Sequence, residues 1–321
     1  MWLAEAVSDV LRFPHWLRWV PDWYPGAGRE PSQRSVLWEA CWVPWLPELF
    51  SAPALAQIQD RLQREELDTV PYYHGFLTGE FDALIRSFVG EPEVHYPVRG
   101  RVKGERAFAA YAAATKAWLE ERDASIDDIG LLRTERRAVG EAILHLDGEG
   151  ESADLPVAIA SDRRPDGRME EVRVYYSSWP LTGRHANRPP VLQPDPDLRP
   201  ADVMGDYQRA LATGDLEAAL AAFEPGGYAR EPAGTDYVHR GPAGLREFFE
   251  WLFSNHGGIP LEHCSVTDDG RTCALEYNVV RWGENELPPE AGVAIYVRGE
   301  TGKLAAARIY DDVDPPVGAP A

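Results

Sequence analysis

Lysine and cysteine are scarce in this sequence, and it has no long apolar run. Three of each residue occur among 321 residues: Lys103, Lys116, Lys303, Cys41, Cys264 and Cys273. The cysteines form neither a CxxC pair nor a metal-ligand spacing, so we expect the free thiols of a reducing compartment. No apolar run approaches the ~18 residues that cross a bilayer. The first residues, MWLAEAVSDVLRF, carry acids where a signal peptide carries positive charge, which predicts a cytoplasmic protein.

Basic residues are also fewer than acidic ones. The chain has 32 basic against 52 acidic residues, a net charge of −20. Nucleic acids and anionic membrane surfaces bind clustered Lys and Arg, and the sequence shows no such cluster, so neither is an expected partner. The hydrophobic content of 44% and the charged content of 26% are typical of a globular protein, and the length suffices for two domains.

An internal repeat is the strongest feature of what the sequence does contain. The segment TGEFDALIRSF at Thr78 returns as TGDLEAALAAF at Thr213. Each is followed by an X-Pro strand and then by an amphipathic helix, ERAFAAYAAATKAWL in the first copy and PAGLREFFEWLF in the second. Each copy ends in a hairpin that closes on Arg-x-Tyr, at Arg173 and at Arg308. The same order of elements at offsets of 135 to 137 residues indicates a duplication.

Each copy is expected to form a helix, a short strand, a second helix and then three or four long strands joined by hairpin turns. Strands that follow helices in this way are typical of an α+β domain with its helices on one face of a curved antiparallel sheet. We therefore predict two tandem cone-shaped domains, residues 69–183 and 201–316. The proline-rich segment 184–200 between them is predicted to be a stiff, extended linker.

The N-terminal segment 1–68 differs from both copies. It holds seven of the eleven tryptophans, interrupted by prolines, and one plausible helix, ALAQIQDRLQREEL. We interpret the tryptophans as a strap that buries its rings against the repeats. The alternatives are a lid over a pocket and an arm that docks a partner. The segment lacks a basic face, which disfavours a membrane-surface role.

Three motifs of the second copy carry a family resemblance: DYQRALATGDLEAALAAF (206–223), YAREPAG (228–234) and RGPAGLREFF (240–249). They resemble the SnoaL-like and ketosteroid isomerase branch of the nuclear transport factor 2-like superfamily. The resemblance covers residues 204–316 and, more weakly, 71–180. It implies domains that pair through their sheets, which a tandem chain achieves internally as a pseudo-dimer, with a homodimer still open. It leaves the reaction open, because isomerases, epoxide hydrolases, dehydratases, polyketide cyclases and binding domains share this fold.

The resemblance to ketosteroid isomerases implies two catalytic residues. Those enzymes carry a Tyr seven residues before the Gly of the first Gly-Asp, where Tyr207 stands, and a general-base carboxylate before a Pro, where Glu231 stands. A carboxylate in a concave apolar pocket is a suitable base near neutral pH. The second acid of the oxyanion hole is missing, because its place falls on Ala294. The alternatives are a surface carboxylate for Glu231 and a core-filling ring for Tyr207.

The strand CALEYNVVRW supplies the candidate substrate-binding residues. Leu275, Tyr277 and Val279 alternate onto one face, and a cavity-facing Tyr277 would replace the missing donor. The set is completed by Trp282 and Tyr296. Further candidates for polar wall positions, each more often a surface group, are His239, Arg281 and Asp311. His256 and His263 have no partner at ligand spacing, so we expect no metal, and the chemistry implied needs no cofactor.

The first copy lacks the groups for acid–base work. Tyr72 keeps the helix position, but Tyr96 stands where the base would be, and a phenol with an ordinary pKa near 10 is a poor base at pH 7. His95 precedes it on the opposite face of the strand. Ala158 is expected to correspond to Ala294. We therefore expect the first copy to be structural or to bind a ligand without chemistry.

Two functions fit these residues. The first is a small-molecule enzyme of the SnoaL-like kind acting on a hydrophobic metabolite, with Glu231 as acid/base and Tyr207 as hydrogen-bond donor; isomerisation, cyclisation, dehydration and epoxide opening all fit. The second is a non-catalytic binding or scaffold protein. Partner docking through the tryptophan-rich segment is compatible with either. An enclosed cavity in the second copy would favour the enzyme.

Overall fold

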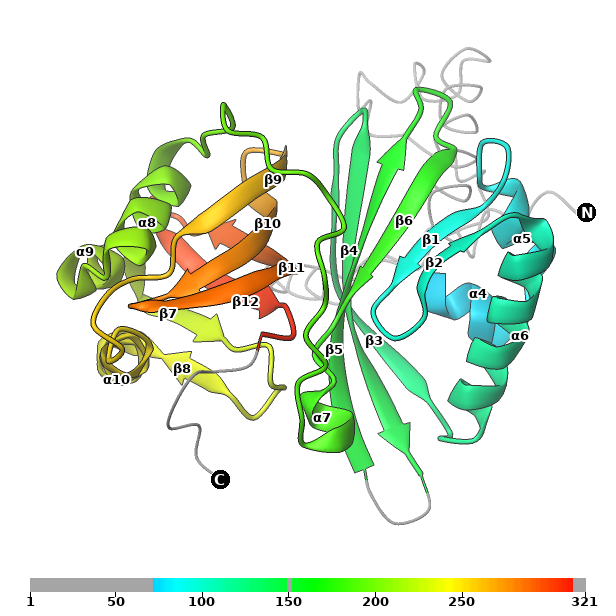
Figure 1. Ribbon diagram of the computed structural model, residues 1–321, viewed down its shortest axis with the longest axis horizontal. Helices are drawn as coiled ribbons and strands as arrows, with labels where there is room; N and C mark the ends of the chain where they lie inside the picture. The colour runs from blue at the N-terminus through cyan, green and yellow to red at the C-terminus, as the bar shows by residue number, and fades with distance from the viewer. Residues whose placement is uncertain (1–71, 149–151, 314–321) are drawn as a thin grey trace, which may run out of the picture. The chain divides into compact units, whose positions relative to one another are not determined.

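The computed structural model describes residues 72–148 and 152–313 of the chain (Figure 1). All of them belong to one compact unit, Ala56–Ala321. The tryptophan-rich segment 1–68 and Cys41 lie outside the described residues, and so do the predictions made for them. Within the described part, both Cys264 and Cys273 are free thiols. None of the described helices has the length and apolar character of a membrane span.

Two sets of elements follow one another along the chain (Figure 1). The first comprises α4 Tyr72–Thr78, α5 Phe81–Arg86, β1 Glu93–Tyr96, β2 Gly100–Lys103, α6 Glu105–Glu120, β3 Ser125–Arg133, β4 Arg137–Asp147, β5 Ser152–Arg163, β6 Met169–Tyr175 and α7 Trp179–Thr182. The second comprises α8 Asp202–Thr213, α9 Leu216–Ala221, β7 Phe223–Arg230, β8 Val238–Arg240, α10 Gly241–Leu252, β9 Leu261–Asp268, β10 Thr272–Trp282, β11 Asn285–Arg298 and β12 Leu304–Tyr310.

Both sets form a six-stranded sheet with the same strand order. The order is β2-β1-β6-β5-β4-β3 in the first and β8-β7-β12-β11-β10-β9 in the second. The pairs β1–β6 and β7–β12 are parallel and the other pairs antiparallel, so the sheets are mixed rather than wholly antiparallel as predicted. In each domain the larger helices lie on one face of the sheet (Figure 1). The prediction of two tandem α+β domains is confirmed.

The Gly-Asp motif explains how the second domain begins; the first copy has Gly79-Glu80 at this place. In the second domain α8 ends at Gly214, whose φ of 72° is the left-handed conformation that glycine adopts most readily. A Cβ there would lie 2.9 Å from the backbone of Gly257, so the close approach also requires glycine. The next residue, Asp215, caps α9 by accepting a hydrogen bond from the Ala218 N–H at 3.0 Å. The motif therefore folds the helix pair against the sheet.

The prediction that Ala158 corresponds to Ala294 is wrong by one residue. Ala294 lies opposite Ile309 in the second sheet, and Ile159 holds the same place opposite Val174 in the first. A one-residue slip along a strand turns a side chain to the other face. Ala158 accordingly packs in the apolar cluster that joins the two sheets, whereas Ile159 packs into the core of the first domain.

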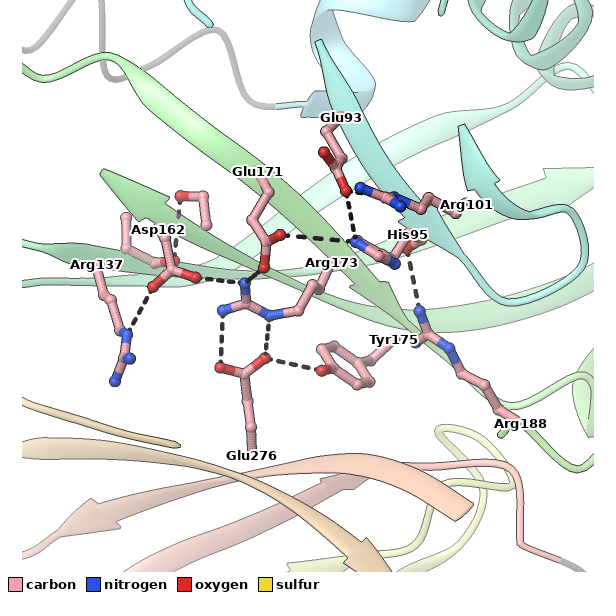
Figure 2. Close-up of polar contacts among 12 residues, drawn as sticks. Glu93, His95, Arg101, Arg137, Asp162, Glu171, Arg173, Tyr175, Arg188 and Glu276 are labelled. Atoms are coloured by element: carbon pink, nitrogen blue, oxygen red, sulfur yellow. Dashed lines mark hydrogen bonds and ion pairs between the residues drawn. The ribbon is translucent and has the colours of Figure 1, made fainter. Parts of the chain in front are cut away.

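A buried ion pair joins the first sheet to the second. Arg173 donates through Nε and Nη2 to the carboxylate of Glu276, at 2.6 and 3.0 Å, and the Tyr175 hydroxyl donates to the same carboxylate at 2.8 Å (Figure 2). The Arg173 side chain is fully buried and also contacts Asp162 and Glu171 of its own domain. Three carboxylates thus surround one guanidinium.

The second copy returns the same contact to the first. Arg308 donates to both carboxylate oxygens of Glu141 at 2.6 Å, and the Tyr310 hydroxyl donates to Glu141 at 2.7 Å. In each copy, the Arg and Tyr of the Arg-x-Tyr motif therefore donate hydrogen bonds to the equivalent Glu of the other copy. Such reciprocal contacts are expected of a two-fold interface. An apolar cluster surrounds these pairs: Leu132, Val139, Ala158, Ala160, Tyr175, Ala274, Ala291, Val293, Ile295 and Tyr310. These contacts support internal pairing of the two copies, and the oligomeric state of the chain stays a prediction.

Residues 184–200, all of them described, form neither helix nor strand. They are not a free spacer, because both sheets hold them. Arg188 is buried, donates to the backbone carbonyl of His95 at 3.1 Å (Figure 2), and accepts at its own carbonyl from the Ala291 N–H at 2.8 Å. The Asp195 N–H donates to the carbonyl of His263 at 2.8 Å. The predicted linker is therefore a packed part of the structure.

Candidate active site in the second domain

A cavity of about 470 Å³ lies in the second domain, between α8, α10 and the face of its sheet. Most of its wall is aromatic or aliphatic. The aromatic residues are Trp179, Tyr207, Tyr237, Phe248, Trp251, Tyr277, Trp282 and Tyr296, and the aliphatic ones include Leu211, Leu252, Ile259, Leu261, Val279, Ile309 and Val313. The polar wall residues are His185, Glu231, His239, Glu247 and Asp311.

Most of the residues that the sequence singles out meet at this cavity. Those that line it are Tyr207, Glu231, Tyr277, Val279, Trp282 and Tyr296. Leu275 shares the strand face of Tyr277 but does not line the cavity, because it is fully buried among core side chains. This corrects its predicted place from substrate wall to core. Arg281 is exposed and does not line the cavity either.

A tyrosine–carboxyl pair forms part of the wall. The Tyr277 hydroxyl donates to Oδ2 of Asp311 at 2.8 Å. Burial raises the pKa of Asp311 to about 6, the hydrogen bond from Tyr277 lowers it, and the neighbouring Asp312 carboxylate raises it. Asp311 follows β12, where alternation places it with Ile309 on the cavity side. A carboxyl group with a pKa near 6 exchanges protons readily at neutral pH.

The Tyr277 hydroxyl is thus not a free donor. The sequence predicts that a cavity-facing Tyr277 replaces the missing oxyanion donor, but its hydrogen is committed to Asp311. For Asp311, the sequence predicts no more than one of three possible polar wall positions. Its signal in the sequence was its position directly after the second Arg-x-Tyr, on the face that alternation assigns to the cavity.

A second carboxylate is paired with a histidine. Oε1 of Glu231 lies 2.5 Å from Nε2 of His239, and both side chains are partly buried. The His239 ring stacks on Phe248 with centroids 4.6 Å apart. Glu231 is placed here because β7 ends before Pro232, and β8 brings His239 back beside it. The predicted base therefore lies against an imidazole and not on a bare apolar wall, which makes the pair a two-group proton carrier.

The Tyr207 hydroxyl is available to a ligand. Its ring packs 5.6 Å from Tyr296 and 6.1 Å from Phe249, and burial raises its pKa. Among the described residues its hydroxyl has no hydrogen-bond partner. Tyr296 accepts from Nε2 of Gln208 at 2.8 Å, which does not use its own O–H donor. Tyr207 therefore brings an uncommitted donor to this cavity, as its predicted role requires.

No lysine or arginine stands among the described residues that line the cavity, whereas Glu231, Glu247 and Asp311 do. A site with carboxylates and no cation disfavours anionic ligands, because their charge would be desolvated next to like charge. The wall therefore suits an uncharged or cationic molecule with a large apolar part.

Possible metal ligands in the described residues lie elsewhere. Glu93, His95 and Glu171 of the first domain bring one ligand atom each to within 4.8 Å of one another (Figure 2). Their carboxylates are already neutralised: Glu93 pairs with Arg101 and Lys103, which hold its pKa at about 2. This cluster is a network of ion pairs on a sheet rather than a site for a cation.

The cone of the first domain is filled with rings. The Tyr72 hydroxyl donates to the Tyr111 hydroxyl at 2.5 Å, and the Tyr96 ring lies 5.3 Å from Tyr111 and 5.6 Å from Tyr176. A hollow of about 440 Å³ in this domain lies at β2 and α6, lined mostly by exposed residues, and includes neither Tyr72 nor Tyr96. These two predicted equivalents therefore serve packing.

Comparison with known proteins gives a family for the second domain. Residues 205–307 match the SnoaL-like domain family. No curated protein sequence matches the chain. Among solved structures, Bal32a from a soil-derived mobile gene cassette is 20% identical and covers 39% of this chain and 97% of its own, with a TM-score of 0.32.

Two further solved structures are similar over about a third of the chain. A polyketide cyclase-like protein of Sinorhizobium meliloti is 17% identical over 34% of this chain and 94% of its own, with a TM-score of 0.30. The epoxide hydrolase/cyclase-like enzyme SalBIII is 16% identical over 36% of this chain and 92% of its own, with a TM-score of 0.29. The second domain thus matches the SnoaL-like domain family over residues 205–307, and the first domain has the same strand order.

Proposed function

We propose that the second domain is an acid–base active site for an uncharged, ring-containing small molecule. The observation that carries this proposal is the Asp311 carboxyl group, which lines an aromatic cavity with its pKa raised to about 6. A carboxyl group whose pKa burial raises in this way weakens the fold, and such groups concentrate at functional sites. Glu231 with His239 supplies a second proton carrier in the same cavity.

The reaction that these groups support is a proton transfer between two ligand atoms. Ionised Asp311 accepts a proton from an acidic C–H or O–H of the ligand, and the released electron pair moves to an adjacent oxygen. The Tyr207 hydroxyl donates a hydrogen bond to that oxygen. The proton returns to another ligand atom from Asp311 or from the Glu231–His239 pair, so no electrons are gained or lost. An isomerisation follows these steps directly. In a dehydration the electron pair instead expels a hydroxyl group, which leaves as water with the returning proton. In an epoxide opening, or a cyclisation that uses one, the deprotonated O–H attacks an epoxide carbon, and the released epoxide oxygen takes the returning proton.

Binding is tested first, with two fluorescent probes that share one ring system. N-Phenyl-1-naphthylamine is uncharged, and 8-anilinonaphthalene-1-sulfonate adds a sulfonate to it. We expect the uncharged probe to bind at least tenfold more tightly, because the cavity holds carboxylates and no cation. Val279→Trp fills the cavity and should abolish binding. Equal affinity for both probes would contradict the proposed ligand class.

Proton transfer is tested with 2-tetralone, a bicyclic ketone with acidic C–H groups, in deuterated water. Deuterium incorporation, followed by NMR, should exceed the uncatalysed rate and rise with pH through about 6, as Asp311 ionises. Asp311→Asn should reduce the enzymatic rate about 10²- to 10⁴-fold, the usual range for a lost general base. If the wild type binds the probe but does not exchange deuterium into 2-tetralone, the non-catalytic binding function is favoured.

A further inference from the structure

Part of the second domain's cavity wall comes from outside that domain. Trp179 and His185 line the cavity, although both belong to the segment 177–186 that follows β6 of the first domain. Their rings contact each other in a tilted arrangement, with centroids 5.0 Å apart and planes inclined by 30°. Together they add aromatic surface to the cavity wall.

One carboxylate fixes this segment. Oδ1 of Asp312 accepts hydrogen bonds from the Ser177 hydroxyl at 2.8 Å and the Ser178 N–H at 3.0 Å, and it lies 3.1 Å from Nδ1 of His185. Oδ2 accepts from the Ser178 hydroxyl at 2.7 Å and the Ala186 N–H at 2.8 Å. All of these donors belong to the segment 177–186. The Asp312 side chain of the second domain thus contacts both ends of this segment.

The Asp312 carboxylate is ionised in this arrangement. It is almost fully buried, with 3% of the residue exposed, and burial alone would raise its pKa. The hydrogen bonds from His185, Ser178 and Ala186 outweigh burial and lower that pKa. An imidazole whose Nδ1 faces a carboxylate is held in one ring orientation, which leaves Nε2 as the nitrogen not engaged by Asp312.

The segment also packs against the loop that carries Glu231. A Cβ on Gly234 would lie 3.6 Å from Cγ of Pro180, so the loop backbone runs directly beside α7. The Thr235 hydroxyl of the same loop donates to Oδ2 of Asp154 in the first domain at 3.1 Å. Asp311 and Asp312 are adjacent in the chain: the Asp311 side chain lines the cavity, and the Asp312 side chain contacts the segment 177–186. The backbone that places the candidate base therefore also places the wall.

We propose that the segment 177–186 is a fixed wall of the ligand site in the second domain, where Trp179 and His185 contact the ligand and favour molecules with aromatic rings. Asp312 is the positioning residue that holds them there. The first domain thereby completes a site whose acid–base groups all belong to the second. This inference rests on the ligand cavity of the proposed function but not on its chemistry.

The ligand-contacting role is tested by the affinity of the full chain for N-phenyl-1-naphthylamine. Trp179→Ala and His185→Ala should each weaken binding roughly tenfold, as expected for the loss of an aromatic contact in a ligand site. The matched controls are Trp118→Ala, another half-buried tryptophan of the first domain, and His74→Ala on its surface; both should leave affinity within twofold. If Trp179→Ala and His185→Ala bind the probe as tightly as the control variants do, the proposal is overturned.

The positioning role of Asp312 needs a separate measurement. In Asp312→Ala, trypsin should cleave after Arg184 at least tenfold faster, because the segment loses its acceptor, while cleavage after the exposed Arg168 should not change. The double variant Asp312→Ala with Trp179→Ala should bind the probe no more weakly than the weaker single variant, since both remove the same contact. Additive losses would overturn the positioning role. Ser178→Ala, which removes one donor, gives the same test should Asp312→Ala not fold.

The outcomes separate this inference from the proposed function. A wild-type chain that does not bind the probe overturns both. Binding that Val279→Trp abolishes, but that Trp179→Ala and His185→Ala leave unchanged, retains the cavity and overturns the contribution of the first domain. Weaker binding in both segment variants, with unchanged controls, supports the inference whether or not the protein turns over 2-tetralone.

Discussion

The two cones share a strand order and differ at the positions where chemistry would occur. Tyr72 and Tyr207 occupy the same place on the first helix of each copy. Beyond them, the first cone has Tyr96 where the second has Glu231. Likewise, Tyr176 stands where Asp311 does, since each follows the last residue of its Arg-x-Tyr. The packing of Tyr96 on Tyr176, with rings 5.6 Å apart, also shows that these two positions are neighbours within a cone.

This difference indicates what a cavity costs a fold in stability. Tyrosine rings in the first cone bury apolar area and satisfy a hydroxyl, as between Tyr72 and Tyr111. The second cone forgoes that packing for a cavity and holds the buried Asp311 carboxyl group at a raised pKa. Lost packing and a desolvated carboxyl group both reduce stability. We therefore expect the first domain to stabilise the chain and the second to carry its function.

Exchanging the residue that differs most should give the largest effect. Tyr176→Asp removes a buried ring and places a carboxyl group in a filled cone, which should lower the free energy of unfolding by on the order of 5 kcal/mol. The reverse change, Asp311→Tyr, places a ring in open space and should cost little stability while abolishing probe binding. Chemical denaturation and probe titration measure the two effects. Similar losses of stability in both variants would contradict the contrast between the cones.

The two reciprocal ion pairs should differ in how much the loss of their arginine lowers the free energy of unfolding. Arg173→Met leaves Glu276, Asp162 and Glu171 around an uncharged side chain, and should cost about 5 kcal/mol in the free energy of unfolding. Arg308→Met leaves only Glu141 and should cost about 3 kcal/mol. Urea denaturation at constant pH compares the two variants. A larger loss for Arg308→Met would show that the carboxylates beside Arg173 do not depend on it.

Two adjacent aspartates should respond to the same substitution with opposite signs. The folded pKa of Asp311 is about 6 against an ordinary 3.8, so its contribution to stability is complete below pH 3.8 and is lost as the pH rises to about 6. Asp311→Asn should therefore stabilise the protein above pH 6, by up to about 3 kcal/mol. Thermal unfolding across pH 4 to 8 should show the gain disappearing toward pH 4.

Asp312→Asn is the matched control for that change. Hydrogen bonds lower the folded pKa of Asp312, so its stabilisation is present at neutral pH and is lost as the pH falls through that value. The amide cannot accept the full set of hydrogen bonds, and we expect a loss of about 2 kcal/mol at pH 7. A gain in both variants, or a loss in both, would contradict the assignment of Asp311 to the cavity and Asp312 to the segment.

The fold could be predicted from the sequence because the duplication is visible as short motifs that recur in the same order. In each copy a glycine with positive φ, Gly79 or Gly214, follows the first helix, and each Arg-x-Tyr closes the last strand, so order and spacing sufficed. Alternation along β10 likewise placed Tyr277 and Val279 on the cavity side. It could not separate Leu275 from them, because all three share a face and only packing decides which one reaches the cavity.

Side-chain contacts between residues far apart in the chain could not be predicted from the sequence. His239 meets Glu231 only because β8 returns beside β7, and Asp311 receives Tyr277 from another strand. The contribution of Trp179 and His185 had no local signal, since the repeat assigns that stretch to the end of the first copy and the linker. Such contacts depend on how two domains meet, which neither composition nor periodicity encodes.

The two helix tyrosines offer the finest test of the comparison. Tyr72→Phe removes a buried hydroxyl that donates to Tyr111 at 2.5 Å, and should lower the free energy of unfolding by about 1 kcal/mol. Tyr207→Phe removes a hydroxyl that has no partner among the described residues, so its stability should stay within about 0.5 kcal/mol of the wild type. If Tyr207 serves the ligand, deuterium incorporation into 2-tetralone should nevertheless fall, whereas Tyr72→Phe should not affect it. A stability loss in Tyr207→Phe equal to that of Tyr72→Phe, with unchanged exchange, would make both tyrosines packing residues and would leave the oxyanion without a donor on this helix.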